Sequence, residues 1–153
     1  MLMNLLYYGF NRALPSGDLA PQFNPGGSIK TTFCNQFIQY VLNGFGYGKM
    51  NGLLANQMFD FLSSPGNGWI SVSDDVAQSH ANNGVIVLAS HKKEGSHGHI
   101  CVIVPGIIEK SHTWGKAVPK CVNVGKDVFF GKKVSFAFTK EEMPVYFALG
   151  EMI

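Results

Sequence analysis

The chain has 153 residues, of which 46% are hydrophobic and 14% charged, and its formal net charge is +2. This length predicts a single domain, residues 1–153, with a core large enough to fold unaided. The low charge content excludes a disordered tail, and the small net charge argues against nucleic acid as a partner. No stretch approaches the ~20 apolar residues of a membrane helix, so no membrane span is expected.

The first residues of the chain do not have the pattern of a secretory signal peptide. Residues 1–14, MLMNLLYYGFNRAL, lack a basic region, and Asn4 and Gly9 interrupt the apolar stretch. We therefore expect a protein made in the cytoplasm without a standard leader. Residues 11–30 contain several prolines and glycines and predict an ordered coil.

Three segments are predicted to be helices, the first two from apolar residues that recur every three to four positions. The first follows Thr31 and Thr32, which offer an N-cap, and ends at Gly44. The second fits residues 51–63. The third fits residues 73–82, where Ser73 is the expected cap and two acidic residues occupy the first turn.

After Gly84 the pattern changes from helical to extended. Short apolar runs bounded by turn residues predict five strands, at residues 84–90, 99–104, 119–124, 134–138 and 145–149. Helices followed by a run of strands indicate the α+β class. We expect an antiparallel sheet of about five strands with the helices on one face.

The cysteines provide the first candidate for chemistry. Cys34, Cys101 and Cys121 cannot all pair, so at least one thiol is free, and their spacing matches no zinc motif. Cys34 falls in the first turn of the first predicted helix. There the helix dipole and unpaired N–H groups lower a thiol pKa and can donate to an oxyanion. A cysteine on an apolar helix face is also commonly a small buried hydrophobe.

The histidines provide candidate bases for that thiol. His99 opens a predicted core strand directly after Gly98, and strand alternation places it on the same face as Cys101. His97 would point the same way if the strand began earlier, so it remains a competitor. His91 and His97 otherwise belong to a lysine-rich turn, where we expect them to be solvated.

Three short segments together resemble a known superfamily. TTFCNQF at a helix start, then GVIVLAS and then GHICVIV, resemble the NlpC- and CHAP-type cell-wall amidases and endopeptidases, which are papain-like. The resemblance covers about residues 31–125. It implies N-terminal helices packed on a C-terminal sheet, with Cys34 as nucleophile and His99 as base.

The same resemblance implies a third polar residue on the strand that follows the histidine strand, and PKCVNVG supplies Asn123 there. Antiparallel pairing of residues 99–104 with 119–124 would bring Asn123 near His99, on a shared face. An amide oxygen could then hold one ring nitrogen and leave the other for the thiol. An Asn before Gly125 is equally typical of a turn.

The sequence also departs from the superfamily pattern. Phe33 and Asn35 flank the cysteine where the superfamily commonly has a polar and a small residue, so no role is transferred to them. The upstream aromatic residue of the oxyanion site has no certain counterpart, and Tyr7 and Tyr8 are the candidates. The expected groove loops are residues 15–30, 64–70 with Trp69, and 107–117 with Trp114.

The implied activity is hydrolysis of peptidoglycan peptides, with no cofactor and no metal. A leaderless catalytic domain is similar to type VI secretion amidase effectors, which would act in the periplasm and require an immunity protein, and also to phage endolysins. A papain-like deamidase or protein-directed peptidase would use the same residues. Two readings of another class stay open. One is a metal- or ligand-binding module with His91, His97 and His99, and the other is a domain in which Cys34 is only core.

Overall fold

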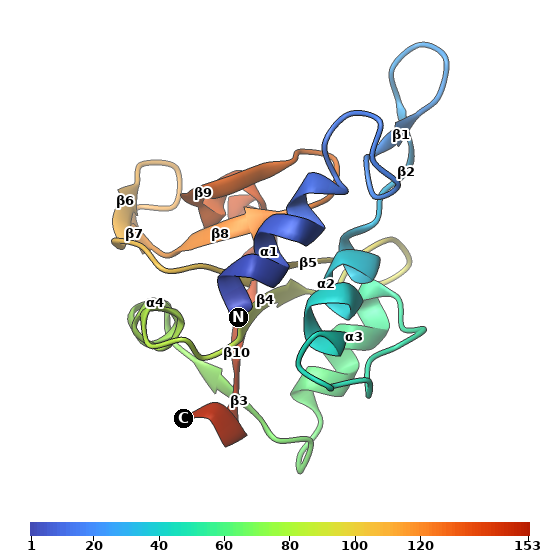
Figure 1. Cartoon of the computed structure of the whole chain (residues 1–153). Coiled ribbons are helices and arrows are strands. Elements are labelled where there is room, and N and C mark those ends of the chain that lie inside the picture. The colour runs from blue at the N-terminus through green and yellow to red at the C-terminus, as the bar shows by residue number, and fades with distance from the viewer.

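The computed structural model describes residues 1–153 as an α+β protein (Figure 1). Its helices are α1 (Leu2–Asn11), α2 (Cys34–Asn43), α3 (Ala55–Ser63) and α4 (Asp74–Asn82), with short 3-10 helices at Val134–Phe136, Lys140–Glu142 and Gly150–Met152. Its strands are β1 (Gln22–Phe23), β2 (Ile29–Thr31), β3 (Trp69–Val72), β4 (Val87–His91), β5 (His99–Ile103), β6 (Glu109–Ser111), β7 (Lys116–Val118), β8 (Lys120–Asn123), β9 (Phe129–Lys133) and β10 (Val145–Leu149). None of the helices combines the length and apolar character needed to cross a membrane.

The main sheet has six antiparallel strands in the order β3-β10-β4-β5-β8-β9. This confirms the α+β class and the antiparallel sheet, with six strands where about five were predicted. The central strands β4 and β5 are buried on both faces, which explains why their sequences are continuous apolar runs. Small hairpins, β1–β2 and β6–β7, stand apart from this sheet.

Helices cover both faces of the sheet, so the prediction that they share one face is wrong. The side chains of α1, α2 and α3 pack on the face that presents Leu88 and Ile100. Helix α4 packs on the opposite face, where Ala77 and Ala81 meet Val87. The physical reason is the apolar character of β4 and β5 on both sides, since each face must be covered to exclude water.

The three predicted helices all form, but not with the predicted start in every case, and the structure adds a fourth, α1. Helix α2 begins at Cys34 after Phe33, with no side-chain cap, and Thr31 ends β2 instead of capping the helix. Helix α3 begins at Ala55, later than predicted. Helix α4 has the predicted cap, since Ser73 Oγ accepts a hydrogen bond from the N–H of Val76 at 3.4 Å.

The strand prediction for residues 134–138 is wrong. Val134–Phe136 forms a 3-10 helix, because the N–H groups of Ala137 and Phe138 both reach the carbonyl oxygen of Val134. The neighbouring strand β9 was missed, and it contains Gly131 at φ +83°, a residue that weakens the strand pattern. Helix α1, edge strand β3 and the β1–β2 hairpin were also not predicted.

Candidate active site

Cys34 is the first residue of α2, and the apolar stripe of that helix decides where the thiol lies. Phe37, Ile38 and Val41 are fully buried at helical spacing and hold α2 against the sheet near β5. Cys34 itself is 6% exposed and belongs to the same core. Its position in the first turn of the helix confirms the sequence prediction.

Two opposing influences act on the Cys34 thiol. Burial is the larger and raises its pKa to about 11, whereas the backbone N–H groups of Ile100, Asn35 and Cys34 lower it. The donors at the helix start therefore act in the predicted direction, but desolvation outweighs them. The expectation of a lowered thiol pKa is wrong for the resting protein, in which the thiol is protonated at neutral pH.

The structure brings His99 and Asn123 together. Asn123 Oδ1 lies 2.6 Å from His99 Nε2, and Asn123 Nδ2 donates to the carbonyl oxygen of Asp127 at 2.8 Å. The bond to Asp127 requires the amide nitrogen on that side, so the amide oxygen must face the imidazole. Nε2 therefore carries the ring proton, and Nδ1 is left as the basic nitrogen. Asn123 thus makes both the turn contact and the histidine contact considered from the sequence.

The two strands pair antiparallel, as the sequence argument required, and their side chains share the predicted face. Strands β5 and β8 are antiparallel, with Val102 opposite Val122, and Cys101 and Cys121 lie in the same core cluster. Because side chains alternate along each strand, His99 and Asn123 also share that face. The pairing places the start of β5 beside the end of β8.

The imidazole of His99 sits in a confined space. Its ring centroid lies 5.0 Å from that of Phe138, and a Cβ at Gly125 would come within 2.9 Å of the ring carbon Cε1. Burial lowers the pKa of His99, while the hydrogen bond that its Nε2–H donates to Asn123 acts in the opposite direction. The imidazole is consequently neutral at neutral pH, as a base must be before it accepts a proton.

Cys34 and His99 lie near the same end of β5 but on its two faces, Cys34 with Ile100 and His99 with Cys101, and no hydrogen bond joins their side chains. The thiol faces the backbone N–H of Ile100, the residue after His99. Cys34 lines a cavity of about 600 Å³, and His99 lines another of about 780 Å³. His97 and Gly98 border both cavities, so this short segment separates the thiol from the imidazole.

The other histidines do not form a metal centre. His91 pairs with His99 across β4 and β5, and His91, His97 and His99 all line the larger cavity. No group of three or more His, Cys, Asp or Glu side chains is arranged to hold a metal ion. The metal-binding alternative therefore lacks a ligand set, and all three cysteines are free thiols.

The aromatic candidates and groove loops are only partly at the site. Tyr7 stacks on Phe130, and neither Tyr7 nor Tyr8 lines the cavity at Cys34. Trp69 is buried and donates to the hydroxyl of Tyr47 at 2.8 Å, away from both cavities. Trp114 does line the cavity at His99, as expected for the loop of residues 107–117.

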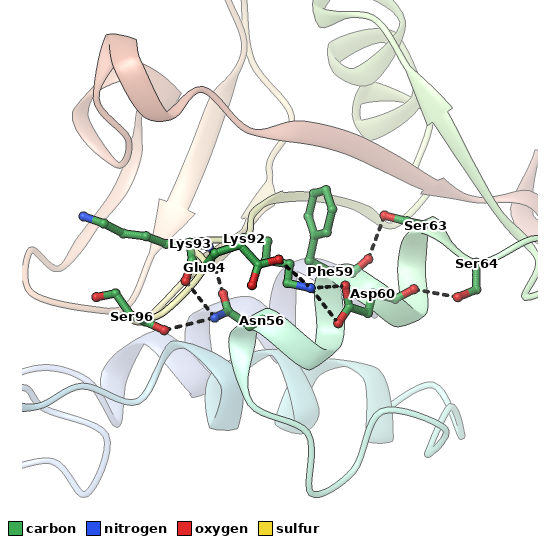
Figure 2. A network of polar contacts seen from close by, with 9 residues as sticks. All are labelled: Asn56, Phe59, Asp60, Ser63, Ser64, Lys92, Lys93, Glu94 and Ser96. Atoms are coloured by element: carbon green, nitrogen blue, oxygen red, sulfur yellow. Dashed lines mark hydrogen bonds and ion pairs between the residues drawn. The ribbon is translucent and has the colours of Figure 1, made fainter.

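Sequence reasoning missed the side chains that frame the site. Asn56 of α3 borders the cavity at Cys34 and holds the loop before β5 by three hydrogen bonds (Figure 2). Asn35 donates to the carbonyl oxygen of Leu53 at 3.2 Å. Isolated asparagines carry no sequence signal for such roles, because their partners are backbone atoms distant in the chain.

Comparison with known proteins adds no family to this description. The chain matches no protein-family model, and no curated protein matches it.

Proposed function

We propose that the protein is a cysteine hydrolase with Cys34 as nucleophile, His99 as base and Asn123 as the residue that orients His99. One observation carries this proposal: the 2.6 Å contact between His99 Nε2 and Asn123 Oδ1, at the end of β5 that the Cys34 thiol also reaches. A neutral imidazole with one nitrogen held and the other free is the arrangement that a thiol nucleophile requires. The papain-like fold is part of this proposal, and the α+β architecture supports it.

The first half of the reaction uses the two side chains in concert. His99 Nδ1 accepts the proton of the Cys34 thiol as the sulfur attacks the carbonyl carbon of the scissile amide. Concerted transfer suits a thiol whose pKa is raised to about 11, because little thiolate exists beforehand. Backbone N–H groups at the start of α2 have no acceptor within the helix and can donate to the oxyanion.

The second half restores the enzyme. The imidazolium gives its proton to the leaving amine, the C–N bond breaks, and an acyl-thioester on Cys34 remains. His99 then takes a proton from water, whose oxygen attacks the thioester carbon, and returns that proton to the sulfur as it leaves. Asn123 holds Nε2–H throughout, which favours the ring orientation needed for each transfer.

The proposed substrate is a peptidoglycan stem peptide or cross-link, cleaved by an amidase or endopeptidase. The resemblance of TTFCNQF and GHICVIV to cell-wall hydrolases supports this class. The two cavities also suit a substrate with both charge signs, since Lys30 lies at one and Lys126, Asp127 and Glu142 at the other. Stem peptides carry free amino and carboxylate groups.

The biological setting follows from the same resemblance. We place the protein with type VI secretion effectors, made in the cytoplasm, exported by a non-standard route and active on the cell wall in the periplasm. An immunity protein that blocks the cavity at Cys34 would protect the producing cell. A phage endolysin would share the chemistry, and a deamidase or protein-directed peptidase would share the residues.

Digestion of purified peptidoglycan tests the activity. Wild-type protein should release muropeptides whose masses identify the cleaved bond, and Cys34→Ala should release none. Protein substrates, assayed in parallel for ammonia release and for new amino termini, test the deamidase and peptidase alternatives. Intact peptidoglycan after incubation with folded wild-type protein would contradict the proposed substrate.

Expression in two compartments tests the effector reading. Targeting the protein to the periplasm should lyse cells, whereas cytoplasmic expression should not, because the wall is reached only from the periplasm. The Cys34→Ala variant is the matched control in both compartments. Equal harmlessness of the wild type in the two compartments would count against an effector.

A further inference from the structure

One side chain of α3 holds the loop of residues 92–98, which joins β4 to β5 (Figure 2). Asn56 Nδ2 donates to the carbonyl oxygens of Lys93 and Ser96, at 3.0 Å each. Asn56 Oδ1 accepts from the N–H of Lys93 at 3.0 Å. Both amide protons are therefore used by the loop, and a backbone donor of the loop is satisfied in return.

The loop approaches Asn56 so closely that only glycine fits beside it. A Cβ at Gly98 would collide with Asn56 Oδ1 and with the carbonyl oxygen of His91. The next residue along the chain is His99. Asn56 therefore contacts the backbone immediately before the proposed base, at the segment that separates the two cavities.

The helix of the proposed nucleophile is tied to the same part of the molecule. Asn35, the neighbour of Cys34, donates to the carbonyl oxygen of Leu53 at 3.2 Å, and Gln39 donates to the same oxygen at 3.2 Å. Leu53 lies just before α3, whose first turn carries Asn56. Hydrogen bonds thus tie the start of α2 to the residue before α3, and the first turn of α3 to the loop before His99.

The geometry points to Asn56 as a positioning residue that sets where His99 stands relative to Cys34. The inference rests on the proposed function, since it takes Cys34 and His99 as the reacting pair. Asn56 acts through the loop, because its amide protons are occupied by loop carbonyls. The ion pair between Lys92 Nζ and Asp60 Oδ1 is exposed, 2.9 Å long, and joins the same two elements. Its removal therefore serves as the control for the removal of the Asn56 hydrogen bonds.

Alkylation of Cys34 by iodoacetamide, followed by mass spectrometry across pH, tests the inference without any substrate. In the wild type we expect alkylation to depend on neutral His99, giving an acid limb that His99→Ala removes. In Asn56→Ala the loop loses three hydrogen bonds, and we expect His99 to shift relative to Cys34. Alkylation near neutral pH should then fall about 10- to 100-fold, the effect of a displacement of about 1 Å.

Matched variants separate positioning from general loosening of the structure. Ser63→Ala removes a hydroxyl of α3 that bonds only to the carbonyl oxygen of Phe59, and Lys92→Ala removes the exposed ion pair. Both should keep the wild-type alkylation profile. With a peptide substrate, Asn56→Ala should lower kcat far more than it changes KM, because the cavity residues remain.

If circular dichroism and thermal unfolding show that Asn56→Ala does not fold, Asn56→Asp replaces it in the test. It retains an acceptor for Lys93 and loses both donors, so its alkylation near neutral pH should fall as in Asn56→Ala. A wild-type profile in a folded Asn56 variant would overturn the inference and leave the proposed function standing. A wild-type protein whose Cys34 alkylation is indifferent to His99→Ala would overturn both.

Discussion

The protein buries its three cysteines in two regions with different surroundings. Cys101 and Cys121 lie on β5 and β8 in the core beneath α4, fully enclosed and adjacent to one another. Cys34 lies at the start of α2, beside a cavity and within reach of three backbone N–H groups. Burial raises the pKa of Cys34 and of Cys101 alike. What differs is whether anything nearby can stabilise a negative charge.

This difference shows why burial alone does not identify a structural cysteine. At Cys101 the neighbouring thiol of Cys121 raises the pKa further, and no donor opposes it. At Cys34 the N–H groups of Ile100 and Asn35 favour the thiolate, and the residue before Ile100 is His99, the proposed base. The enclosed pair has only core surroundings, whereas the thiol at the helix start has the surroundings on which its proposed role as nucleophile rests.

Replacing each cysteine in turn is the most direct test of the difference between the two regions, and it should give the largest effect. Cys34→Ala should abolish peptidoglycan hydrolysis, with a loss on the order of 10⁶-fold, as for other nucleophiles of catalytic triads. Cys101→Ala and Cys121→Ala should keep activity and lose stability, by about 1 kcal/mol each. Muropeptide release and thermal unfolding measure the two effects. Comparable cleavage by Cys34→Ala would refute the mechanism.

The histidine variants test which base serves the reactive thiol. His99→Ala should lower the rate by about 10²- to 10⁴-fold, the usual contribution of general acid–base catalysis. His97→Ala should lose much less, because His97 borders both cavities but has no hydrogen bond to Asn123. Steady-state rates at neutral pH decide between them. A loss confined to His97→Ala would refute the assignment of His99.

Asn123→Ala should have a smaller effect than either change above. The imidazole keeps its chemistry but loses the partner of Nε2, so the rate should fall by up to about 10²-fold, as for a misplaced group. The acid limb of the pH–rate profile should also shift, because the hydrogen bond that His99 donates to Asn123 raises the pKa of His99. Loss of that bond moves the limb to lower pH. Full activity with an unchanged profile would leave Cys34 and His99 as a dyad.

The pH dependence of the free energy of unfolding should show the smallest effect. It reports on Cys34 at alkaline pH and on His99 at acid pH. Above about pH 9 the unfolded chain loses a proton that Cys34 keeps until about pH 11, so stability falls as pH rises. Below about pH 6.5 unfolded His99 binds a proton that the folded protein resists, so stability falls as pH drops. The loss from Cys34 is on the order of 2–3 kcal/mol, because its pKa differs by about two units between the folded and unfolded states.

Chemical unfolding of the wild type, Cys34→Ala and His99→Ala at several pH values separates these contributions. Cys34→Ala should lose part of the alkaline dependence, the remainder coming from Cys101, whose pKa is also raised. His99→Ala should lose the acid dependence. Parallel curves for wild type and His99→Ala below pH 6.5 would contradict a buried neutral imidazole.

The sequence by itself determined the elements whose signals are local. Apolar spacing marked α2 and α3, a serine before two aspartates marked the start of α4, and apolar runs marked β4, β5, β8 and β10. It also predicted the antiparallel pairing of β5 with β8, and hence the neighbourhood of His99 and Asn123, because strand alternation has a fixed period.

Only the tertiary structure decided the features that depend on segments distant in the chain. Edge strand β3 and the glycine-containing β9 exist because their partners β10 and β8 are in place, and α4 crosses to the second face because both faces of β4 and β5 are apolar. The same holds for the pKa of Cys34, which depends on desolvation and on backbone donors from another element. It also holds for the hydrogen bonds of Asn56 to the loop before His99, because no local pattern encodes those contacts. Burial and hydrogen bonding are properties of the assembled chain, and for that reason the thiol pKa was predicted in the wrong direction although its position was predicted correctly.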